Sequence, residues 1–550
     1  MAEPRLRRSA GIVGVAVLGS RIAGLAREIV FATLFGAGRE LDAFIAAFRI
    51  PNLFRDLFAE GALSAAFVPT FARTLDRDGQ EAAWRLANRV LNGLLLVVGT
   101  ITLLGVVFAP FLVDLIAPGF RSDPGKAELT ILLARILFPF LLFIALAAVA
   151  MGVLNTFGVF GIPASASTFF NLGSIGVGLA CATALAPDYV WAVGSRLFGH
   201  ATAIPTDRAG PALVGMAIGT LAGGALQCLV QLPALVRAGF RYRLVAGFRD
   251  PAVAEILGLM APATIGVAAV QVNVVVNTYF ASTLGNGPVS WLSVAFRLMY
   301  LPIGMFGVAL GTVALPSVVR AASRGDMEQF RRHVGEALRL VILLCVPAAV
   351  GLAVASRPVI AFIYEHGRFG PEDTRAAALA LSAYAIGLTG YAAIKILGPA
   401  FYALKDAGTP MRVSLSSVFT NLVLNWSALN LLGLGHGGLA LSTSLVALSN
   451  SAVLYRRLVR RMGSLDSDLF RHTTRTLLAS ALMGGVSWAW LAWLGRSPHT
   501  TAAELLRVVT VIPLGGGTFY AAGRALGIAE LADLPSPRRW RATLLERRSP

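Results

Sequence analysis

Residues 20–28 of this chain read SRIAGLARE, and this stretch decides the fold. It lies inside a long apolar run near the N-terminus, and the apolar run that follows also contains acids and arginines. Ionisable side chains at membrane depth are costly unless they face a cavity or a partner. The stretch therefore predicts membrane helices whose arginines line a polar cavity and hold an anionic lipid headgroup.

The composition is that of a membrane protein. Only 14% of the 550 residues are charged, whereas a soluble domain carries about 25%. The net charge of +18 comes almost entirely from arginine. In a soluble protein this charge would indicate nucleic-acid binding, but in a membrane protein basic residues gather on cytoplasmic loops and contact anionic lipid. The three cysteines are far apart in apolar runs, so we expect neither a disulfide framework nor a metal site.

The apolar runs predict an all-α polytopic membrane protein with fourteen transmembrane helices, each long enough for about 30 Å of hydrocarbon. The first is predicted to be retained rather than cleaved as a signal peptide, because its run continues through Arg21 and Arg27. Arginines gather in the loops after the second, sixth, eighth and twelfth spans and in the tail, which predicts that both termini are cytoplasmic. The predicted spans are 10–36, 40–71, 84–117, 128–155, 163–186, 211–236, 251–283, 288–319, 333–356, 374–404, 410–433, 437–461, 472–495 and 501–526.

A weak internal duplication relates the two halves of the chain. Five residue pairs occupy equivalent places in the helix order, and each pair is separated by the same interval of 247 residues (316 − 69 for the first): Pro69/Pro316, Arg73/Arg320, Glu81/Glu328, Arg85/Arg332 and Pro163/Pro410. Two six-helix lobes in parallel orientation follow, a plan used by many transporters. We expect one lobe at 1–240, the second at 241–465, an additional helix pair at 466–530 and a basic cytoplasmic tail at 531–550.

The charges within the spans are unbalanced. Residues seven apart share a helix face, as Arg21 and Glu28 do, and Arg49 shares one with both Asp42 and Asp56. A surplus of buried cations predicts an external anion, and the guanidinium fork suits phosphate or pyrophosphate. Alternatively, the charges pair with one another and fix helix packing. The cations are Arg21, Arg27, Arg49, Arg55, Arg297 and Lys395, and the nearby acids are Glu28, Asp42, Asp56 and Glu60.

Other polar residues give weaker signals. Span 251–283 contains Gln271, Asn273 and Asn277, and span 410–433 contains Asn421 and Asn425 one turn apart. Such amides usually form hydrogen bonds between membrane helices, and a ligand or ion role is the alternative. We find no nucleophile–base set, so we predict no catalytic residue and no enzyme activity.

Short motifs along nearly the whole chain resemble those of the MurJ (MviN) lipid II flippases, in the MOP exporter superfamily. The most specific lie in the first eighty residues, and later ones agree; they are SR…RE at 20–28, FGAG at 35–38, DAF at 42–44, PNL at 51–53, FAEGA at 58–62, SW…RLM at 290–299, GVALGT at 307–312 and FYALKD at 401–406. The resemblance implies fourteen helices in two six-helix lobes plus a final pair. It also implies transport of the undecaprenyl-pyrophosphate-linked disaccharide-pentapeptide from the inner to the outer leaflet of the bacterial cytoplasmic membrane.

The resemblance also implies site residues. The family's cavity arginines fall on Arg21, Arg27, Arg55 and Arg297, and its acidic position falls on Asp42. With the charge argument, our candidate substrate-binding residues are Arg21, Arg27, Asp42, Arg49, Arg55, Arg297 and Lys395. The final helix pair is implied to offer a hydrophobic groove to the lipid tail.

This chain departs from the family at two places. Phe296 and Tyr300 stand where relatives have acids, which makes this cavity wall more positive. The acids that bind sodium in some relatives correspond to Asn277 and Asn425 here. A possible ion site would therefore comprise Asn277, Asn421, Asn425 and Ser442.

We expect alternating access by a monomer that contacts lipid II and membrane lipids. The coupling is expected to involve the membrane potential or a monovalent cation, with no cofactor, metal or nucleic acid. Two other classes stay open: a sibling exporter of another polyprenyl-linked saccharide or of small molecules, and a membrane enzyme acting on polyprenyl phosphates. A purely structural membrane protein would have no use for the surplus cations.

Overall fold

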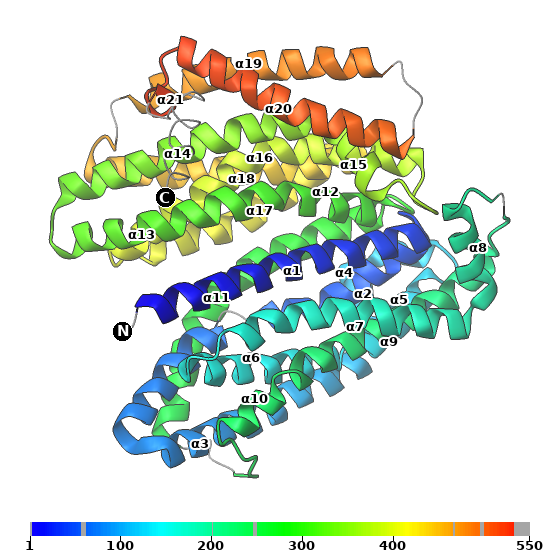
Figure 1. The fold of residues 1–550 in the computed structure, drawn as a ribbon, viewed down its shortest axis with the longest axis vertical. Coiled ribbons are helices and arrows are strands. Elements are labelled where there is room, and N and C mark those ends of the chain that lie inside the picture. The colour runs from blue at the N-terminus through cyan, green and yellow to red at the C-terminus, as the bar shows by residue number, and fades with distance from the viewer. Residues whose placement is uncertain are drawn as a thin grey trace, which may run out of the picture. The chain divides into compact units, whose positions relative to one another are not determined.

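The computed structural model describes residues 3–56, 62–200, 202–245, 250–465, 468–495 and 500–532 (Figure 1). Within these ranges the regular elements are helices, and no β-strand occurs. The all-helical prediction is therefore confirmed. The motif at 58–61 and residues 533–550 of the predicted basic tail lie outside the described residues.

The chain divides into two compact units. The first comprises Met1–Trp291 and Tyr364–Asp373, and the second comprises Leu292–Ile363 and Thr374–Pro550. The lobe boundaries given above, at 240 and 465, stay a prediction.

The first unit contains helices α1 to α11 and the beginning of α12. α1 packs on α7, α2 on α5, α3 on both α6 and α11, and α7 on α9. The bounds are α1 Glu3–Phe35, α2 Arg39–Arg55, α3 Ala62–Val107, α4 Ala109–Ile116, η2 Pro118–Ser122, α5 Lys126–Leu137, α6 Phe140–Thr156, α7 Gly161–Leu185, α8 Pro187–Leu197, η3 Thr206–Arg208, α9 Ala209–Leu229, α10 Leu232–Arg237 and α11 Pro251–Ser282.

The second unit contains most of α12 and the helices that follow. α13 packs on α14, α17 on α18, and the final pair α19 and α20 pack on each other and on α14 (Figure 1). The bounds are α12 Pro288–Pro302, η4 Ile303–Gly307, α13 Val308–Ser323, α14 Met327–Val354, α15 Ser356–Tyr364, α16 Pro371–Ala403, α17 Gly408–Asn430, α18 Gly435–Met462, α19 Leu469–Leu494, α20 Thr501–Ala525 and α21 Ala529–Ala532.

Prolines break several of the predicted spans into shorter helices. The span at 84–117 is interrupted after Val107, just before Pro110, and the span at 128–155 is interrupted at Pro139. Span 288–319 contains a π-helical turn directly after Pro302. Proline removes a backbone N–H donor and clashes with the preceding turn, so each break follows from the local sequence.

Helix α3 continues through residues 72–83, which lie between two predicted spans. It runs from Ala62 to Val107 and is kinked at Gly79, whose φ of 81° is in the left-handed region that favours glycine. In the second half of the chain, Gly325 has a φ of 71° between α13 and α14. Pro69 lies in α3 and Pro316 lies in α13, before these two glycines; the duplication stays a prediction.

Ten helical stretches in the described residues are long and apolar enough to cross a membrane. Four helices that correspond to predicted spans are not among them, namely α1, α2, α11 and α17. α2 is only 17 residues long. These four helices carry most of the arginines and amides singled out above, although Arg297 lies on α12, which is among the ten. The exact count of fourteen spans stays a prediction.

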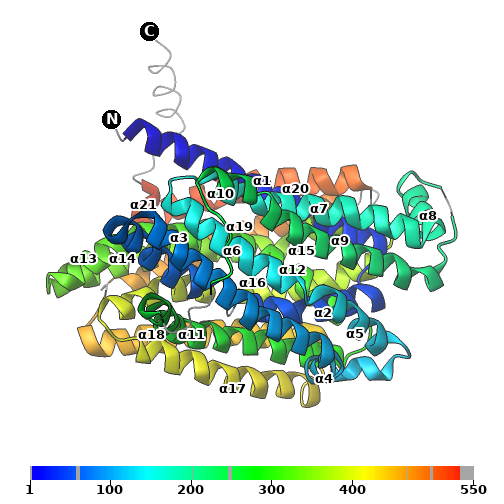
Figure 2. The same ribbon diagram turned by 90° about the horizontal axis from the view of Figure 1, so that it is seen from below.

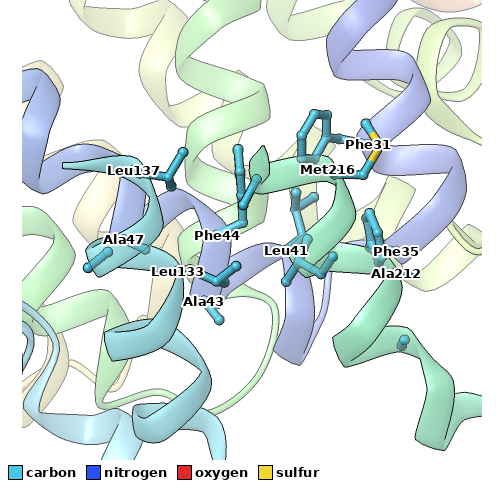
Figure 3. Close-up of a cluster of buried hydrophobic side chains, with 14 of the residues drawn as sticks. Phe31, Phe35, Leu41, Ala43, Phe44, Ala47, Leu133, Leu137, Ala212 and Met216 are labelled. Atoms are coloured by element: carbon cyan, nitrogen blue, oxygen red, sulfur yellow. The ribbon is translucent and has the colours of Figure 1, made fainter. Parts of the chain in front are cut away.

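A cluster of buried apolar side chains fixes α2 within the first unit. Leu41, Ala43, Phe44 and Ala47 of α2 pack with side chains from α1, α5 and α9, including Leu133 (Figure 3). Ala43 is completely buried. Because these neighbours surround Asp42 on both sides in sequence, they hold its carboxylate in one place.

Glycines allow α7 and α9 to approach each other closely. The two helices lie side by side (Figure 1 and Figure 2). Gly215, Gly219 and Gly223 recur every four residues along α9 and so share one face. A Cβ added at Gly219 would lie 2.2 Å from the Cα atom of Gly178 on α7. Small residues at this spacing are a common means of packing membrane helices.

Asp406 organises the turn between α16 and α17. Its carboxylate accepts hydrogen bonds from the Thr409 backbone N–H at 3.0 Å and the Thr409 hydroxyl at 2.9 Å, and Arg461 lies 3.0 Å away. These interactions, led by the backbone N–H of Thr409, lower the pKa of Asp406 below its ordinary value of 3.8. The ionised form therefore stabilises the folded protein.

We expect Asp406→Asn to be less stable than wild type at pH 7 by about 1 kcal/mol, the usual net contribution of an intramolecular hydrogen bond, because the substitution removes the charge that Thr409 and Arg461 stabilise. A lowered pKa gives stability that is present above the ordinary value and is lost as the pH falls through the folded-state value. The difference in stability between the variant and wild type should therefore shrink below pH 3.8. Thermal melts of the purified protein in detergent at several pH values would measure it. Asp78→Asn, on the exposed part of α3, is the control. A difference that did not depend on pH would contradict this account.

Candidate functional site

Arg27 of α1 faces α7. The guanidinium of Arg27 lies 4.9 Å from the centre of the Phe170 ring, a cation–π distance. Arg21, six residues earlier on the same helix, is exposed. Next to it, the Ser20 carbonyl accepts a hydrogen bond from the Asn171 side chain of α7 at 3.4 Å. An added Cβ at Gly24 would meet Asn171 only at an ordinary 3.6 Å, so Gly24 makes room for a neighbouring side chain without being indispensable.

Two polar bridges join α2 to α11. The Arg49 guanidinium donates to the hydroxyl of Thr278, and the Gln271 amide donates to Asp56 at 2.6 Å. Arg55 forms an ion pair with Asp56 at 2.8 Å. Arg49 and Asp56 are therefore on one helix face, as their spacing predicted. Arg49 and Arg55 thus have partners within the protein, as the alternative of charges that pair with one another and fix helix packing predicts.

Asp42 is completely buried and accepts a dense set of hydrogen bonds. Its carboxylate accepts from the backbone N–H groups of Gly287 at 2.7 Å and Ser290 at 2.8 Å, and from the Ser290 hydroxyl at 2.6 Å. The donors lie at the first turn of α12, where unpaired N–H groups and the helix dipole favour an anion. Asp42 thus caps the N-terminus of a helix that lies far from it in sequence.

Lys126 is the counter-ion of Asp42. Its ammonium lies 3.1 Å from the Asp42 carboxylate and donates to the Asn286 side chain at 2.7 Å. It also lies 4.0 Å above the Phe120 ring, and only 1% of the residue is exposed. Asn286 in turn donates to Asp123 at 2.8 Å. The sequence analysis missed Lys126 because it precedes a predicted span rather than lying within it.

Arg297 and Lys395 are exposed in the second unit, on α12 and α16. The ring of Phe296, next to Arg297, packs against Tyr300, Tyr384 and Tyr391. Lys395 follows Tyr391 by one helical turn and lines a small pocket between α16 and α13. Both cations therefore lie on helices that an aromatic cluster joins.

The residues of the possible ion site fall in different units. Asn421 and Asn425 are buried one turn apart on α17, and Ser442 is buried on α18, which packs against α17. Asn277 lies on α11 in the first unit. Across the described ranges, no three His, Cys, Asp or Glu side chains come together as metal ligands would.

The chain is similar to known proteins over most of its length. The family model described as "Lipid II flippase MurJ" matches residues 31–509. A probable lipid II flippase MurJ of Vibrio cholerae is 35% identical, with 96% of this chain and 98% of the relative covered. A lipid II flippase MurJ of Burkholderia cenocepacia is 36% identical, with 80% of this chain and 81% of the relative covered.

The chain is also similar to solved structures. A lipid II flippase MurJ in an inward closed conformation matches with a TM-score of 0.73 at 25% identity, over 94% of this chain and 99% of that one. An inward-facing multidrug MATE transporter of the MOP superfamily matches with a TM-score of 0.63 at 18% identity, over 81% of this chain and 95% of that one. The second match shows a shared fold alone.

Proposed function

Because this chain belongs to the lipid II flippase MurJ family, we propose that it moves lipid II from the inner to the outer leaflet of the membrane. The observation that carries the proposal is the pair of arginines on α1, Arg21 and Arg27, within a multi-pass membrane protein of this family. Arginine binds pyrophosphate through a planar, often bidentate contact. No observation favours the alternative of a sibling exporter.

The proposed mechanism is alternating access. The pyrophosphate enters from the cytoplasmic leaflet and is held by Arg21, Arg27 and Arg297, while the lipid tail stays in the hydrocarbon. A change of conformation then exposes the headgroup to the outer side. Asp42, Arg49, Arg55 and Lys395 complete the proposed binding set, in which Asp42, Arg49 and Arg55 position helices by the contacts described above.

Energy coupling is part of the proposal. Moving one elementary charge through the membrane potential is worth about 2.3 kcal/mol per 100 mV. A positively charged empty site would be drawn back towards the negative cytoplasm, so the potential could reset the transporter. A monovalent cation at Asn277, Asn421, Asn425 and Ser442 is the second possible coupling. Transport that is indifferent to the potential would rule out the first.

We further propose that the protein works as a monomer in the bacterial cytoplasmic membrane, with both termini inside. The arginine-rich loops support this orientation. The proposed role is transport without a chemical step on the lipid.

The test uses cells depleted of this protein and measures how much lipid II is accessible from outside. Wild type should restore accessibility, and Arg27→Ala should reduce it at least tenfold, because one charge-assisted contact to phosphate is worth about 1.5–3 kcal/mol. Arg77→Ala, at an exposed position of α3, is the matched control and should behave as wild type. All variants must reach the membrane in equal amounts. Accessibility that never falls on depletion would rule out this protein as the main flippase there.

A further inference from the structure

An aromatic cluster joins α12 and α16 within the second unit. The centre of the Phe296 ring lies 5.4 Å from Tyr384 and 6.2 Å from Tyr391, and both contacts are edge-on at 74° and 81°. Tyr300, one turn along α12, lies 5.8 Å from Phe296 at an angle of 34°. Aromatic pairs in this distance range hold one another in defined orientations.

The cluster has a buried base and an open side. Tyr384 is only 3% exposed, whereas Tyr300 is 41% exposed. Tyr391 is half-buried, and its hydroxyl is withdrawn from solvent. The Tyr300 hydroxyl lies on the open side, where a ligand can reach it.

Two cations lie near the exposed side of the aromatic cluster. Arg297 is exposed and adjacent in sequence to Phe296, and Lys395 is exposed one turn beyond Tyr391. On a helix, residues 296, 297 and 300 form a continuous patch. The patch thus combines the exposed Tyr300 and the half-buried Phe296 ring with two exposed cations, Arg297 and Lys395.

We propose that Phe296, Tyr300 and Tyr391 form a stacking surface for the pyranose ring that is attached to the pyrophosphate. A pyranose has one face of C–H groups, which packs on aromatic rings, and an edge of hydroxyls, which bond to tyrosine. Arg297 would hold the phosphate that is covalently bonded to that sugar. This inference rests on the proposed function. It adds a set of residues that would recognise the sugar, whereas the arginines bind the charged pyrophosphate.

The other occupant of such a surface is lipid, since tyrosines also gather at the membrane interface. Both occupants carry phosphate, which Arg297 can contact. The presence of two cations beside the cluster, Arg297 and Lys395, favours a pyrophosphate, which carries more negative charge than the single phosphate of a bilayer lipid.

The test compares two ligands that share the tail and pyrophosphate. Binding of lipid II and of undecaprenyl pyrophosphate, which has no sugar, is measured with the full-length protein in nanodiscs. Tyr300→Leu should weaken lipid II binding about tenfold and leave undecaprenyl pyrophosphate binding unchanged. Tyr300→Phe should keep the aromatic ring that stacks on the sugar. Arg297→Ala should weaken the binding of both ligands. Tyr402→Leu, an exposed α16 tyrosine outside the cluster, is the control.

Phe296→Leu should likewise lower the preference for lipid II over undecaprenyl pyrophosphate. The measured quantity is a ratio of two affinities, so partial misfolding, which affects both ligands equally, cannot produce this change. Equal losses for both ligands would overturn the inference, since the cluster would then only support Arg297. Unchanged binding of both would also overturn it and would assign the patch to lipid. If wild type bound neither lipid, the proposed function itself would fail.

Discussion

Replacing Asp42 by alanine is expected to lower the free energy of unfolding by about 3–5 kcal/mol. The change removes the acceptor for the N–H groups of Gly287 and Ser290 and for the Ser290 hydroxyl. It also leaves the buried Lys126 ammonium without its carboxylate. An uncompensated buried charge costs far more than a lost surface ion pair. Denaturant titration of the purified protein in detergent would measure the loss.

A double variant separates the two contributions. If the stranded ammonium dominates, Asp42→Ala combined with Lys126→Met should recover part of the stability lost in Asp42→Ala alone. Lys126→Met alone should cost less than Asp42→Ala, because Asp42 keeps its three donors on the α12 side. Equal stabilities for Asp42→Ala and the double variant would show that Lys126 does not depend on this carboxylate.

Replacing Gly219 by leucine should largely prevent folded protein from accumulating. Even a single Cβ at this position would lie 2.2 Å from the Cα atom and 2.3 Å from the backbone nitrogen of Gly178. The obstacle is the backbone of α7, which cannot rotate away as a side chain can. Overpacking usually costs about 1–3 kcal/mol, and a backbone clash between two long helices should exceed that range.

Gly176→Leu is the matched control for this prediction. Gly176 also lies on α7, but a Cβ there meets nothing within 4 Å. The measurement is the amount of monodisperse protein recovered from membranes by size-exclusion chromatography. A similar recovery of the two variants would mean that the close approach of α7 and α9 is not needed for folding.

The helical class of the fold could be predicted because apolar runs are local signals. The breaks at Pro139 and Pro302 were also available in the sequence, although the predicted spans did not include them. So was the repeat of Gly215, Gly219 and Gly223, whose spacing marks a packing face. The kink at Gly79 was harder to predict, because the charged residues around it suggest a loop as readily as a helix.

The candidate site was predictable only as far as one helix determines it. The shared face of Arg49 and Asp56 follows from their spacing, but their partners Thr278 and Gln271 lie more than 200 residues away. Asp42 stood out as a buried acid, yet nothing near it in sequence indicates that it caps α12. Arg297 stood out by its charge, whereas the aromatic cluster beside it depends on α16, which only the fold brings near.

The cap that Asp42 provides also bears on how the chain is made. Asp42 precedes Ser290 by 248 residues and Lys126 by 84 residues. At ~5–20 residues per second, synthesis separates Asp42 from α12 by an interval on the order of 10–50 seconds. Throughout most of that interval Lys126 is already present, on a helix that packs against α2. The ammonium is thus the first partner available to the newly inserted carboxylate, and it shelters that charge in the membrane until the helix that needs the cap has been synthesised.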